Sequence, residues 1–254
     1  KTILVTPSYP SKKTTIYKIS RNLKIPIVNL PSPSNVLSMV FSDQTFLESN
    51  EKSGIFTINE NCLDISKKKV DSIHQKIFNY NTQIDPITFK GKGVIKSDTN
   101  AVHDGTIIQF PITKKDSNKI YQIVIDNEEN NLYLDYRVCV VNKEIPIIYQ
   151  KYKTLEKRFT NDVLYAKIGA LDCIPQNIKD KIIKFTQEMQ CEFCELDVLK
   201  DNQTGNWFII DLNKTVDHLQ EASAALKQIA KSGKKIMFVA TKKQAKEIVT
   251  ECAK

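Results

Sequence analysis

The stretch that most constrains this chain is residues 194–213, where the order of apolar and polar residues predicts a β-hairpin. Two apolar runs, at residues 196–199 and 207–212, have the length and composition of short strands. The polar segment between them contains Gly205, a residue that tolerates the backbone angles of a tight turn. A hairpin fixes which residues of its two strands face each other, so the acidic residues of this stretch acquire defined neighbours.

Oxygen-bearing side chains occur on both expected strands. Because side chains alternate between the two faces of a strand, Glu195 shares a face with Asp197. Asp211 likewise shares a face with Asn213. If the two faces coincide, the carboxylates converge and need a cation to neutralise them. Oxygen ligands beside substrate phosphates are the ligands that suit Mg²⁺. The alternative is an ordinary hairpin whose acidic residues face solvent.

Length and composition are those of a soluble globular protein. The chain has 254 residues, of which 41% are hydrophobic and 26% charged, and it could form one large domain or two or three small ones. No apolar run approaches the roughly 20 residues of a membrane-spanning helix, and the first residues lack the pattern of a secretory signal. We therefore expect a cytoplasmic protein with no membrane partner.

The cysteines are expected to be reduced and structural. They occur at irregular spacing in a long chain, unlike the cysteine framework of a small secreted protein. The close pair Cys191 and Cys194 has no second pair or matching histidines that would complete a zinc site. A redox motif would begin a helix, whereas this pair leads into an expected strand.

The net charge of +8 is concentrated towards the end of the sequence. Residues 216–254 contain eight lysines and four acidic residues, so this segment carries half of the excess positive charge. Such a segment favours polyanionic partners, and a solvated basic helix face is the simpler alternative.

The rest of the sequence predicts a mixed α/β (α+β) fold, with a small α/β unit first and a β-rich region after it. Helical periodicity occurs at residues 14–23, 66–80 and 177–189. Apolar runs typical of strands occur at residues 2–5, 25–30, 36–41, 94–96, 106–110, 120–125, 132–141 and 145–149. Ser66 or Asp64 is suited to cap the second helix, and we expect His74 on that helix to lie at the surface or at its boundary.

Basic residues occur along the β-rich region in an order that suits phosphate chemistry. Lys96 ends an expected strand before a polar loop, as a lysine placed over phosphates would. Residues 121–126 form an extended segment whose backbone could hydrogen-bond a purine edge. Arg137, Lys151 and Lys153 follow before the acidic hairpin. Phosphoryl chemistry needs positive groups for phosphates and acidic groups for Mg²⁺, because its catalysis is mostly positioning and charge neutralisation.

This order of residues resembles the ATP-grasp superfamily of carboxylate–amine ligases. The resemblance extends over about residues 1–213, and its motifs lie at residues 94–96, 121–124, 135–138, 195–198 and 210–213. It implies a preceding α/β domain and linker helix over residues 1–84. It implies an ATP-grasp-like domain of antiparallel sheets and helices over residues 85–215.

The resemblance also implies ATP as cofactor and a reaction. Lys96 would hold the phosphates of the nucleotide, and Gln122, Ile123 and Val124 would line the adenine hinge. The implied reaction is ATP-dependent activation of a carboxylate substrate, followed by attack of an amine or another nucleophile. One departure from the family lies in residues 97–104, which contain no glycine where a glycine-rich loop usually covers the phosphates.

The remaining residues implied by the resemblance bind metal or act in catalysis. Asp197, Asp211 and Asn213 would coordinate Mg²⁺. Arg137, together with Lys153, would stabilise the transferring phosphate or an acyl-phosphate intermediate. A second departure from the family is Asp211, which stands where a glutamate is usual and so has a shorter reach.

The last segment does not continue this pattern. Residues 216–254 predict a basic helix–strand–helix, and residues 209–254 resemble the bacterial ribosomal small-subunit protein two, which implies RNA contact through this segment. The two resemblances overlap at residues 209–215. Our hypothesis is a hybrid chain, joined there by recombination or by an error of sequence assembly. The alternatives to a ligase are therefore a structural protein that binds ribosomal RNA and a catalytically inactive α/β protein.

Overall fold

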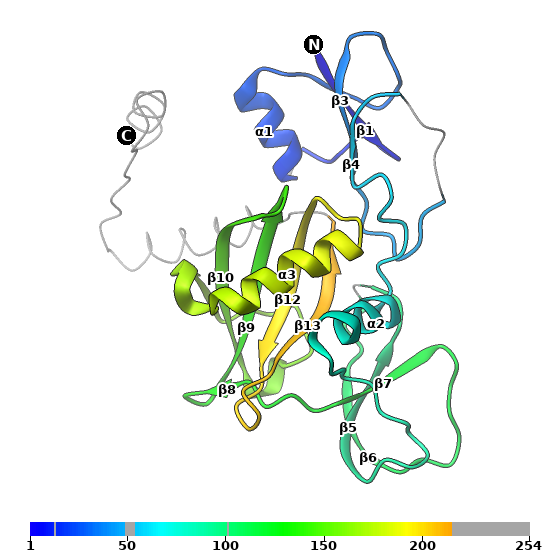
Figure 1. The fold of residues 1–254 in the computed structure, drawn as a ribbon, viewed down its shortest axis with the longest axis vertical. Coiled ribbons are helices and arrows are strands. Elements are labelled where there is room, and N and C mark those ends of the chain that lie inside the picture. The colour runs from blue at the N-terminus through cyan, green and yellow to red at the C-terminus, as the bar shows by residue number, and fades with distance from the viewer. Residues whose placement is uncertain (13, 49–53, 101, 215–254) are drawn as a thin grey trace. The chain divides into compact units, whose positions relative to one another are not determined.

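One parallel and two antiparallel β-sheets make up the part of the chain that the structure describes (Figure 1). The computed structural model describes residues 1–12, 14–48, 54–100 and 102–214. The helix–strand–helix expected over residues 216–254 lies outside this range. For the described residues, the mixed α/β class predicted from the sequence is confirmed.

The first sheet is parallel and contains the beginning of the chain. Its order is β2-β1-β3-β4, with β1 (Thr2–Thr6), β2 (Ile27–Val28), β3 (Asn35–Val40) and β4 (Thr57–Ile58). Helix α1 (Thr15–Leu23) lies between β1 and β2 in the sequence. A small core of its own includes Ile3, Val5, Ile27, Met39 and Phe41. The strand expected at residues 25–30 is shorter than predicted.

A three-stranded antiparallel sheet follows and carries Lys96. Its order is β6-β5-β7, with β5 (Gly91–Ser97), β6 (Thr106–Phe110) and β7 (Lys119–Ile123). The register pairs Val94 with Gln122. Directly opposed residues share a face, as do residues two apart on one strand. Val94, Lys96 and Gln122 therefore lie on the same face of this sheet.

The largest sheet is antiparallel and has the order β11-β10-β9-β12-β13. Its strands are β9 (Leu132–Val141), β10 (Glu144–Thr154), β11 (Tyr165–Gly169), β12 (Phe193–Lys200) and β13 (Trp207–Asn213), and β8 (Glu128–Glu129) pairs with β9. Two 3₁₀ turns, η1 (Leu155–Lys157) and η2 (Leu171–Cys173), flank β11. We call this sheet the central sheet.

Helices α2 (Lys67–Phe78) and α3 (Gln176–Glu188) contribute to the main hydrophobic core with the central sheet (Figure 1). Val138 and Leu196 of the sheet are fully buried in this core. Side chains alternate along strands, so the residues between these apolar positions point to the other face of the sheet. That second face carries the polar groups described below.

Some strands of the β-rich region have the bounds predicted from the sequence, and others do not. β6 and β9 span the predicted residues 106–110 and 132–141. β10 continues to Thr154, beyond the expected residues 145–149. Strands β4, β8 and β11 were not predicted, because two of them are two residues long and β11 has no apolar alternation. No described helix has the length and apolar composition needed to cross a membrane.

Helix α2 begins as predicted but buries His74. The Oγ atom of Ser66 accepts a hydrogen bond from the backbone N of Lys69 at 3.2 Å, which caps the helix. His74 is 0% exposed, so the expectation of a surface or boundary position was wrong. Its ring stacks on Phe78, with centroids 4.3 Å apart, and meets Tyr80 edge-on. Burial lowers the pKa of His74 to about 4.

Candidate functional site

The acidic hairpin forms as predicted, and its two polar faces coincide. Strands β12 and β13 pair with Asp197 opposite Asp211. Two residues further along, Glu195 lies opposite Asn213. Leu196, which alternates with the acidic residues of β12, is buried in the core with the helices. The acidic residues therefore lie on the polar face of the central sheet.

Arg137 of β9 holds both acidic residues of β12. The register places it directly opposite Asp197. Its Nε donates to Asp197 Oδ1 at 2.6 Å, and its Nη2 donates to Asp197 Oδ2 at 3.1 Å. Its Nη1 donates to Glu195 Oε2 at 3.0 Å. Paired bonds of this kind between guanidinium and carboxylate are strong and directional, so the position of the guanidinium is fixed.

Two lysines of β10 extend the charge network on the same face. The Nζ of Lys151 donates to Asp197 Oδ1 at 3.1 Å, and the Nζ of Lys153 pairs with Asp135 Oδ2 at 2.9 Å. Burial alone would raise the pKa of Asp197. The positive charges of Arg137, Lys151 and Lys153 outweigh burial and hold the pKa of Asp197 well below its usual range.

Asp211 has a different environment from Asp197, although the two residues are paired in the hairpin. Its Oδ1 accepts a hydrogen bond from the backbone N of Leu212 at 3.0 Å. Within the described part of the chain, no side chain forms a salt bridge with it. Burial, followed by the charge of Asp197, raises the pKa of Asp211. Asp211 is therefore a carboxylate with spare acceptor capacity for a cation.

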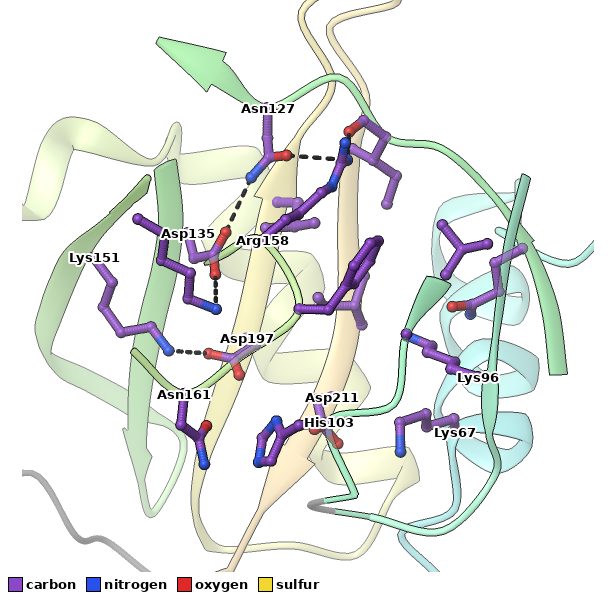
Figure 2. Close-up of a pocket in the computed structure, with 18 of the residues that line it drawn as sticks. Lys67, Lys96, His103, Asn127, Asp135, Lys151, Arg158, Asn161, Asp197 and Asp211 are labelled. Atoms are coloured by element: carbon purple, nitrogen blue, oxygen red, sulfur yellow. Dashed lines mark hydrogen bonds and ion pairs between the residues drawn. The ribbon is translucent and has the colours of Figure 1, made fainter. Parts of the chain in front are cut away.

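Two lysines approach Asp211 from the opposite wall (Figure 2). Lys96 comes from β5 and Lys67 from the first turn of α2, and both side chains extend towards Asp211. The Nζ of Lys67 donates to the backbone O of Thr99 at 2.5 Å. Burial lowers the pKa of Lys96 to about 8, and the charge of Asp211 partly offsets this effect. These lysines are placed to receive an anion beside the acidic hairpin.

Residues 103–105, which precede β6, line the cleft, and Asp104 fixes this segment to the end of β5. This carboxylate accepts hydrogen bonds from the backbone N and the Oγ of Ser97, both at 2.8 Å. It also accepts one from Lys119 Nζ at 2.5 Å. Together these bonds hold the pKa of Asp104 well below its usual range against the effect of burial.

This segment brings His103 and Gly105 to the cleft. His103 has a left-handed φ of 55° and is one of the residues that line the cleft in Figure 2. A Cβ atom on Gly105 would lie 2.6 Å from a ring carbon of Phe159, so this position admits no side chain without a shift of the ring. Residues 97–104 contain no glycine, but the next residue, Gly105, is a glycine at the point where the backbone passes close to the ring of Phe159.

The other end of the cleft is apolar and surrounds Gln122. Its apolar lining comes from both antiparallel sheets and the segment after β7, and consists of Val94, Ile123, Ile125, Leu199 and Ile210. A slot with apolar walls and a polar group at its edge has the composition of a site for a flat aromatic ring. The cleft therefore has an apolar end and a charged end.

Most residues singled out from the sequence meet in this cleft. Its lining includes Lys96, Gln122, Ile123, Arg137, Lys153, Asp197 and Asp211. Val124 follows β7 and Asn213 ends β13, and neither of them lines the cleft.

Sequence reasoning missed several polar residues of the lining. These are Lys67, His103, Asn127, Arg158 and Asn161 (Figure 2). Asp135 belonged to the motif at residues 135–138 and Lys151 to the basic residues expected for phosphates, but neither was assigned to the site. Asp135 could have been found, because it lies two residues before Arg137 on the same strand and so shares its face. Lys67 gave no signal, since only tertiary packing brings the start of α2 to the hairpin.

A metal ion would find two carboxylates here rather than a complete protein cage. Among the residues that the structure describes, no three His, Cys, Asp or Glu side chains are placed to hold a metal. Asp197 and Asp211 are paired on one face and lie among cationic groups. Mg²⁺ is usually bound through one or two carboxylates together with substrate phosphates. The donor set therefore fits Mg²⁺ that arrives with a phosphate ligand.

Solved structures share this architecture over most of the chain. The ATP-grasp ligase PsnB, complexed with a minimal precursor, matches with a TM-score of 0.61 and 11% sequence identity, over 87% of this chain and 94% of that one. The chain has the ATP-grasp fold.

Two further ATP-grasp structures show the same likeness. The D-alanine–D-alanine ligase of Bacillus anthracis, complexed with ATP, matches with a TM-score of 0.51 and 13% identity, over 88% of this chain and 90% of that one. A RimK domain ATP-grasp protein of Sphaerobacter thermophilus matches with a TM-score of 0.53 and 9% identity, over 89% and 95%. The predicted resemblance to ATP-grasp proteins is confirmed at the level of the fold.

The end of the chain is similar to a different family. The model of the ribosomal protein S2 family matches residues 201–254. The small ribosomal subunit protein uS2 of Bacteroides fragilis is 71% identical over 45 residues, and that of Amoebophilus asiaticus is 67% identical over 46 residues. Each alignment covers 18% of this chain, which spans only 16% and 15% of the two relatives.

The two similarities overlap in one strand. The S2 match begins at residue 201, whereas β13 (Trp207–Asn213) is part of the central sheet of the ATP-grasp fold. The predicted likeness of the tail to this ribosomal protein is confirmed, and the overlap is consistent with a hybrid chain.

Proposed function

We propose that this chain binds Mg-ATP in the cleft between the β6-β5-β7 sheet and the central sheet, and that it is an ATP-dependent ligase that activates a carboxylate. The observation that carries this proposal is the placement of Lys96 across the cleft from the paired Asp197 and Asp211. Anion-binding and cation-binding groups on facing walls suit a nucleotide triphosphate with its metal ion. The ATP-grasp fold supports the same assignment.

The charged end of the cleft would hold the triphosphate. Its cationic lining is Lys67, Lys96, Arg137, Lys151 and Lys153, whereas Arg158 donates to the backbone O of Ile125 beside the apolar lining. Its acidic lining is Asp104, Asp135, Asp197 and Asp211. The surplus of positive charge attracts a polyanion, and the flexible ammonium groups of Lys67 and Lys96 can follow the phosphate oxygens.

The acidic hairpin would hold the metal ion. Asp211 would be the main ligand, because it carries no salt bridge within the described residues, whereas Asp197 is already held by Arg137 and Lys151. Asn213 would contribute from the next position on this face of β13. Bound Mg²⁺ supplies charge neutralisation at the phosphates.

Arg137, fixed by Asp197 and Glu195, would direct its charge to the transferred phosphate, with Lys153 beside it. The apolar end would bury the base, with Gln122 and Ile123 in contact and Val124 continuing the segment. The related PsnB structures contain a precursor peptide, so a peptide carboxylate is the first substrate class to test.

Thermal unfolding with and without saturating Mg-ATP tests the binding. A ligand at about 100 times its dissociation constant adds roughly 2.7 kcal/mol to the free energy of unfolding, which raises the melting temperature by a few degrees. We expect this rise to require Mg²⁺. A protein that melts cooperatively and shows no rise would contradict the proposal.

A matched pair of variants on β5 locates the effect. Lys96→Met should remove most of the Mg-ATP-dependent rise, because it deletes a phosphate-binding charge. Lys92→Met changes an exposed lysine of the same strand that does not line the cleft, and it should leave the rise unchanged. Equal behaviour of the two variants would place the nucleotide elsewhere.

A second candidate function concerns the tail. The 71% identity of 45 residues with uS2 supports RNA binding by the basic residues 216–254. This function would show as RNA binding by the whole chain whose affinity falls steeply with salt concentration, because phosphate contacts release counterions. Absence of RNA binding at low ionic strength would remove this candidate.

A further inference from the structure

A hydrogen-bonded chain behind the cleft connects Asp71 of α2 to Gln122 of β7. The Oδ1 of Asp71 accepts hydrogen bonds from the Oγ1 of Thr82 at 2.5 Å and from the backbone N of Thr82 at 2.8 Å. The Oγ1 of Thr82 in turn accepts a hydrogen bond from the Nε2 of Gln122 at 2.5 Å. All three residues are buried, with exposures of 3%, 1% and 5%.

The chemistry of these groups fixes the direction of every bond in the chain. A carboxylate only accepts hydrogen bonds, so the single hydroxyl proton of Thr82 points to Asp71. The lone pairs of that hydroxyl then face Gln122, and only the amide NH₂ of Gln122 can donate to them. The backbone of Thr82 is itself held by β7, because its O accepts a hydrogen bond from the N of Ile123 at 2.8 Å.

The amide oxygen of Gln122 is consequently the end that faces the cleft. Gln122 lines the cleft, and within the described residues its Oε1 has no hydrogen-bond partner. Among those residues, the Nε2 of His74 is the only buried side-chain atom that lacks a partner. The Oε1 of Gln122 is therefore accessible, and it presents an oriented acceptor to whatever occupies the apolar end.

The neighbours of this acceptor suit the edge of a flat ring. Val94 and Ile123 border it on the β6-β5-β7 sheet, and Leu199 and Ile210 lie on the central sheet. A base that enters between these apolar groups would meet the Oε1 of Gln122, an acceptor that cannot become a donor without breaking the buried chain. Breaking it would leave a buried polar group unpaired.

We propose that the chain Asp71–Thr82–Gln122 selects a base with an exocyclic amino group at the edge that meets Gln122, and thereby separates 6-aminopurine from 6-oxopurine nucleotides. This inference rests on the proposed nucleotide site. An amino group of the base can donate a hydrogen bond to the Oε1 of Gln122. A carbonyl oxygen at the same position is itself an acceptor, so the two oxygens would repel each other. Sites that use buried, pre-oriented polar groups reject a mismatched ligand strongly for this reason.

The test compares the dissociation constants of ATP and ITP, which carries a 6-oxo group, in the presence of Mg²⁺. Wild type should bind ATP at least about tenfold more tightly than ITP, which corresponds to about 1.4 kcal/mol. Thr82→Val removes the hydroxyl that holds the amide of Gln122, so the amide can turn, and the ratio of the ITP and ATP dissociation constants should fall below about threefold. Thr82→Ser keeps the hydroxyl and should keep the wild-type ratio.

The ratio separates this role from a structural one, because simple damage to the site would weaken both nucleotides equally. Gln122→Met, which removes the acceptor, should also abolish the preference and keeps the test decisive if Thr82→Val does not fold. Purine riboside triphosphate, which lacks the 6-amino group, should bind wild type more weakly than ATP.

Different failures have different meanings. If no purine nucleotide binds the folded protein, the proposed function is wrong and the selection falls with it. If ATP binds but ITP binds equally well, the nucleotide site stands and only the selection is wrong. An unchanged preference in Thr82→Val would likewise overturn the role of the hydrogen-bonded chain.

Discussion

Asp197 and Asp211 face each other across the β12–β13 hairpin, yet folding shifts the pKa values of their carboxyl groups in opposite directions. Asp197 is held by Arg137 and Lys151, which outweigh the effect of burial. Within the described residues, Asp211 forms no salt bridge. The effect of burial is therefore the largest influence on its pKa, and the pKa is raised. The hairpin thus contains one neutralised acid and one acid that needs a cation.

Removal of the Asp197 charge should destabilise the protein strongly. Asp197→Asn removes the negative charge that Arg137 and Lys151 share, although Arg137 keeps its ion pair with Glu195, and breaking a buried ion pair in this way costs about 3 kcal/mol. The measurement is chemical denaturation at pH 7. Asp162→Asn is the control, because its salt bridge with Lys157 is exposed to solvent and contributes little to stability. Equal losses in the two variants would contradict the assignment.

The same variant has a characteristic pH dependence. Folding lowers the pKa of Asp197, so its stabilisation is complete above the unfolded pKa of about 4 and is lost as the pH falls towards the lower folded value. The stability difference between wild type and Asp197→Asn should be constant near neutral pH and shrink below about pH 4. A difference that grows with acid would contradict this account.

Asp211→Asn should have the opposite effect on the protein without ligand. Folding raises the pKa of Asp211, so the ionised group destabilises the fold at neutral pH, and this penalty grows as the pH rises through the folded pKa. The variant should therefore be at least as stable as wild type at pH 7 and lose that advantage in acid. Melting curves at the two pH values measure it, and a large loss at pH 7 would show that Asp211 has an unseen partner.

The cost of Asp211→Asn should appear only when Mg²⁺ and nucleotide bind. Loss of a ligand carboxylate should weaken Mg-ATP binding at least about tenfold, or about 1.4 kcal/mol. Titration calorimetry measures the affinity, and the exposed Asp162→Asn serves again as the control. An unchanged affinity would remove Asp211 from the metal site.

Nucleotide binding should weaken in alkaline solution because of Lys96. Its pKa is lowered to about 8, first by burial, so the side chain loses its positive charge above that pH. Between pH 8 and 9 the affinity for Mg-ATP should fall by up to about tenfold, as expected for one proton. Lys96→Arg keeps a permanent charge and should show a flat profile over this range. The same slope in both proteins would assign the titration to another group.

His74 should make the fold sensitive to mild acid. Burial lowers its pKa to about 4, so the neutral ring is favoured in the folded state, and stability is lost as the pH falls from about 6.5 towards 4. The loss from this group amounts to about 3 kcal/mol, at 1.36 kcal/mol per pKa unit. His74→Leu should remove that part of the pH dependence in denaturation curves. A profile identical to wild type would show that other groups cause it.

The local features of the site could be predicted from the sequence, because they depend on strand alternation. The hairpin and the shared face within each of its strands, Glu195 with Asp197 and Asp211 with Asn213, follow from apolar runs and a period of two, whereas the pairing of Asp197 with Asp211 was a condition of the prediction. The cations that neutralise Asp197 could not be assigned in this way. The contact of Lys151 with Asp197 depends on the order of three strands in the sheet, which one-dimensional patterns do not specify.

Contacts between elements far apart in the sequence were beyond prediction for a similar reason. His74 was expected near the surface because histidine is polar, but the packing of Phe78, Tyr80 and Phe208 around it encloses the ring. The buried bond from Asp71 to Thr82 likewise joins a helix to a segment outside any predicted element. Such contacts require the tertiary arrangement that they help to stabilise.

Strand β13 determines where this chain can be divided. The S2 family match starts at residue 201, but Trp207 and Leu212 are buried in the core, and the Nζ of Lys214 donates to the backbone O of Cys62 at 3.0 Å. A fragment that ends at residue 200 would lack an edge strand and the part of the cleft lining formed by Ile210 and Asp211. A fragment that ends after residue 214 would retain both. A stable fragment should therefore end after residue 214, where the sheet is complete, and not at residue 200, where the S2 similarity begins.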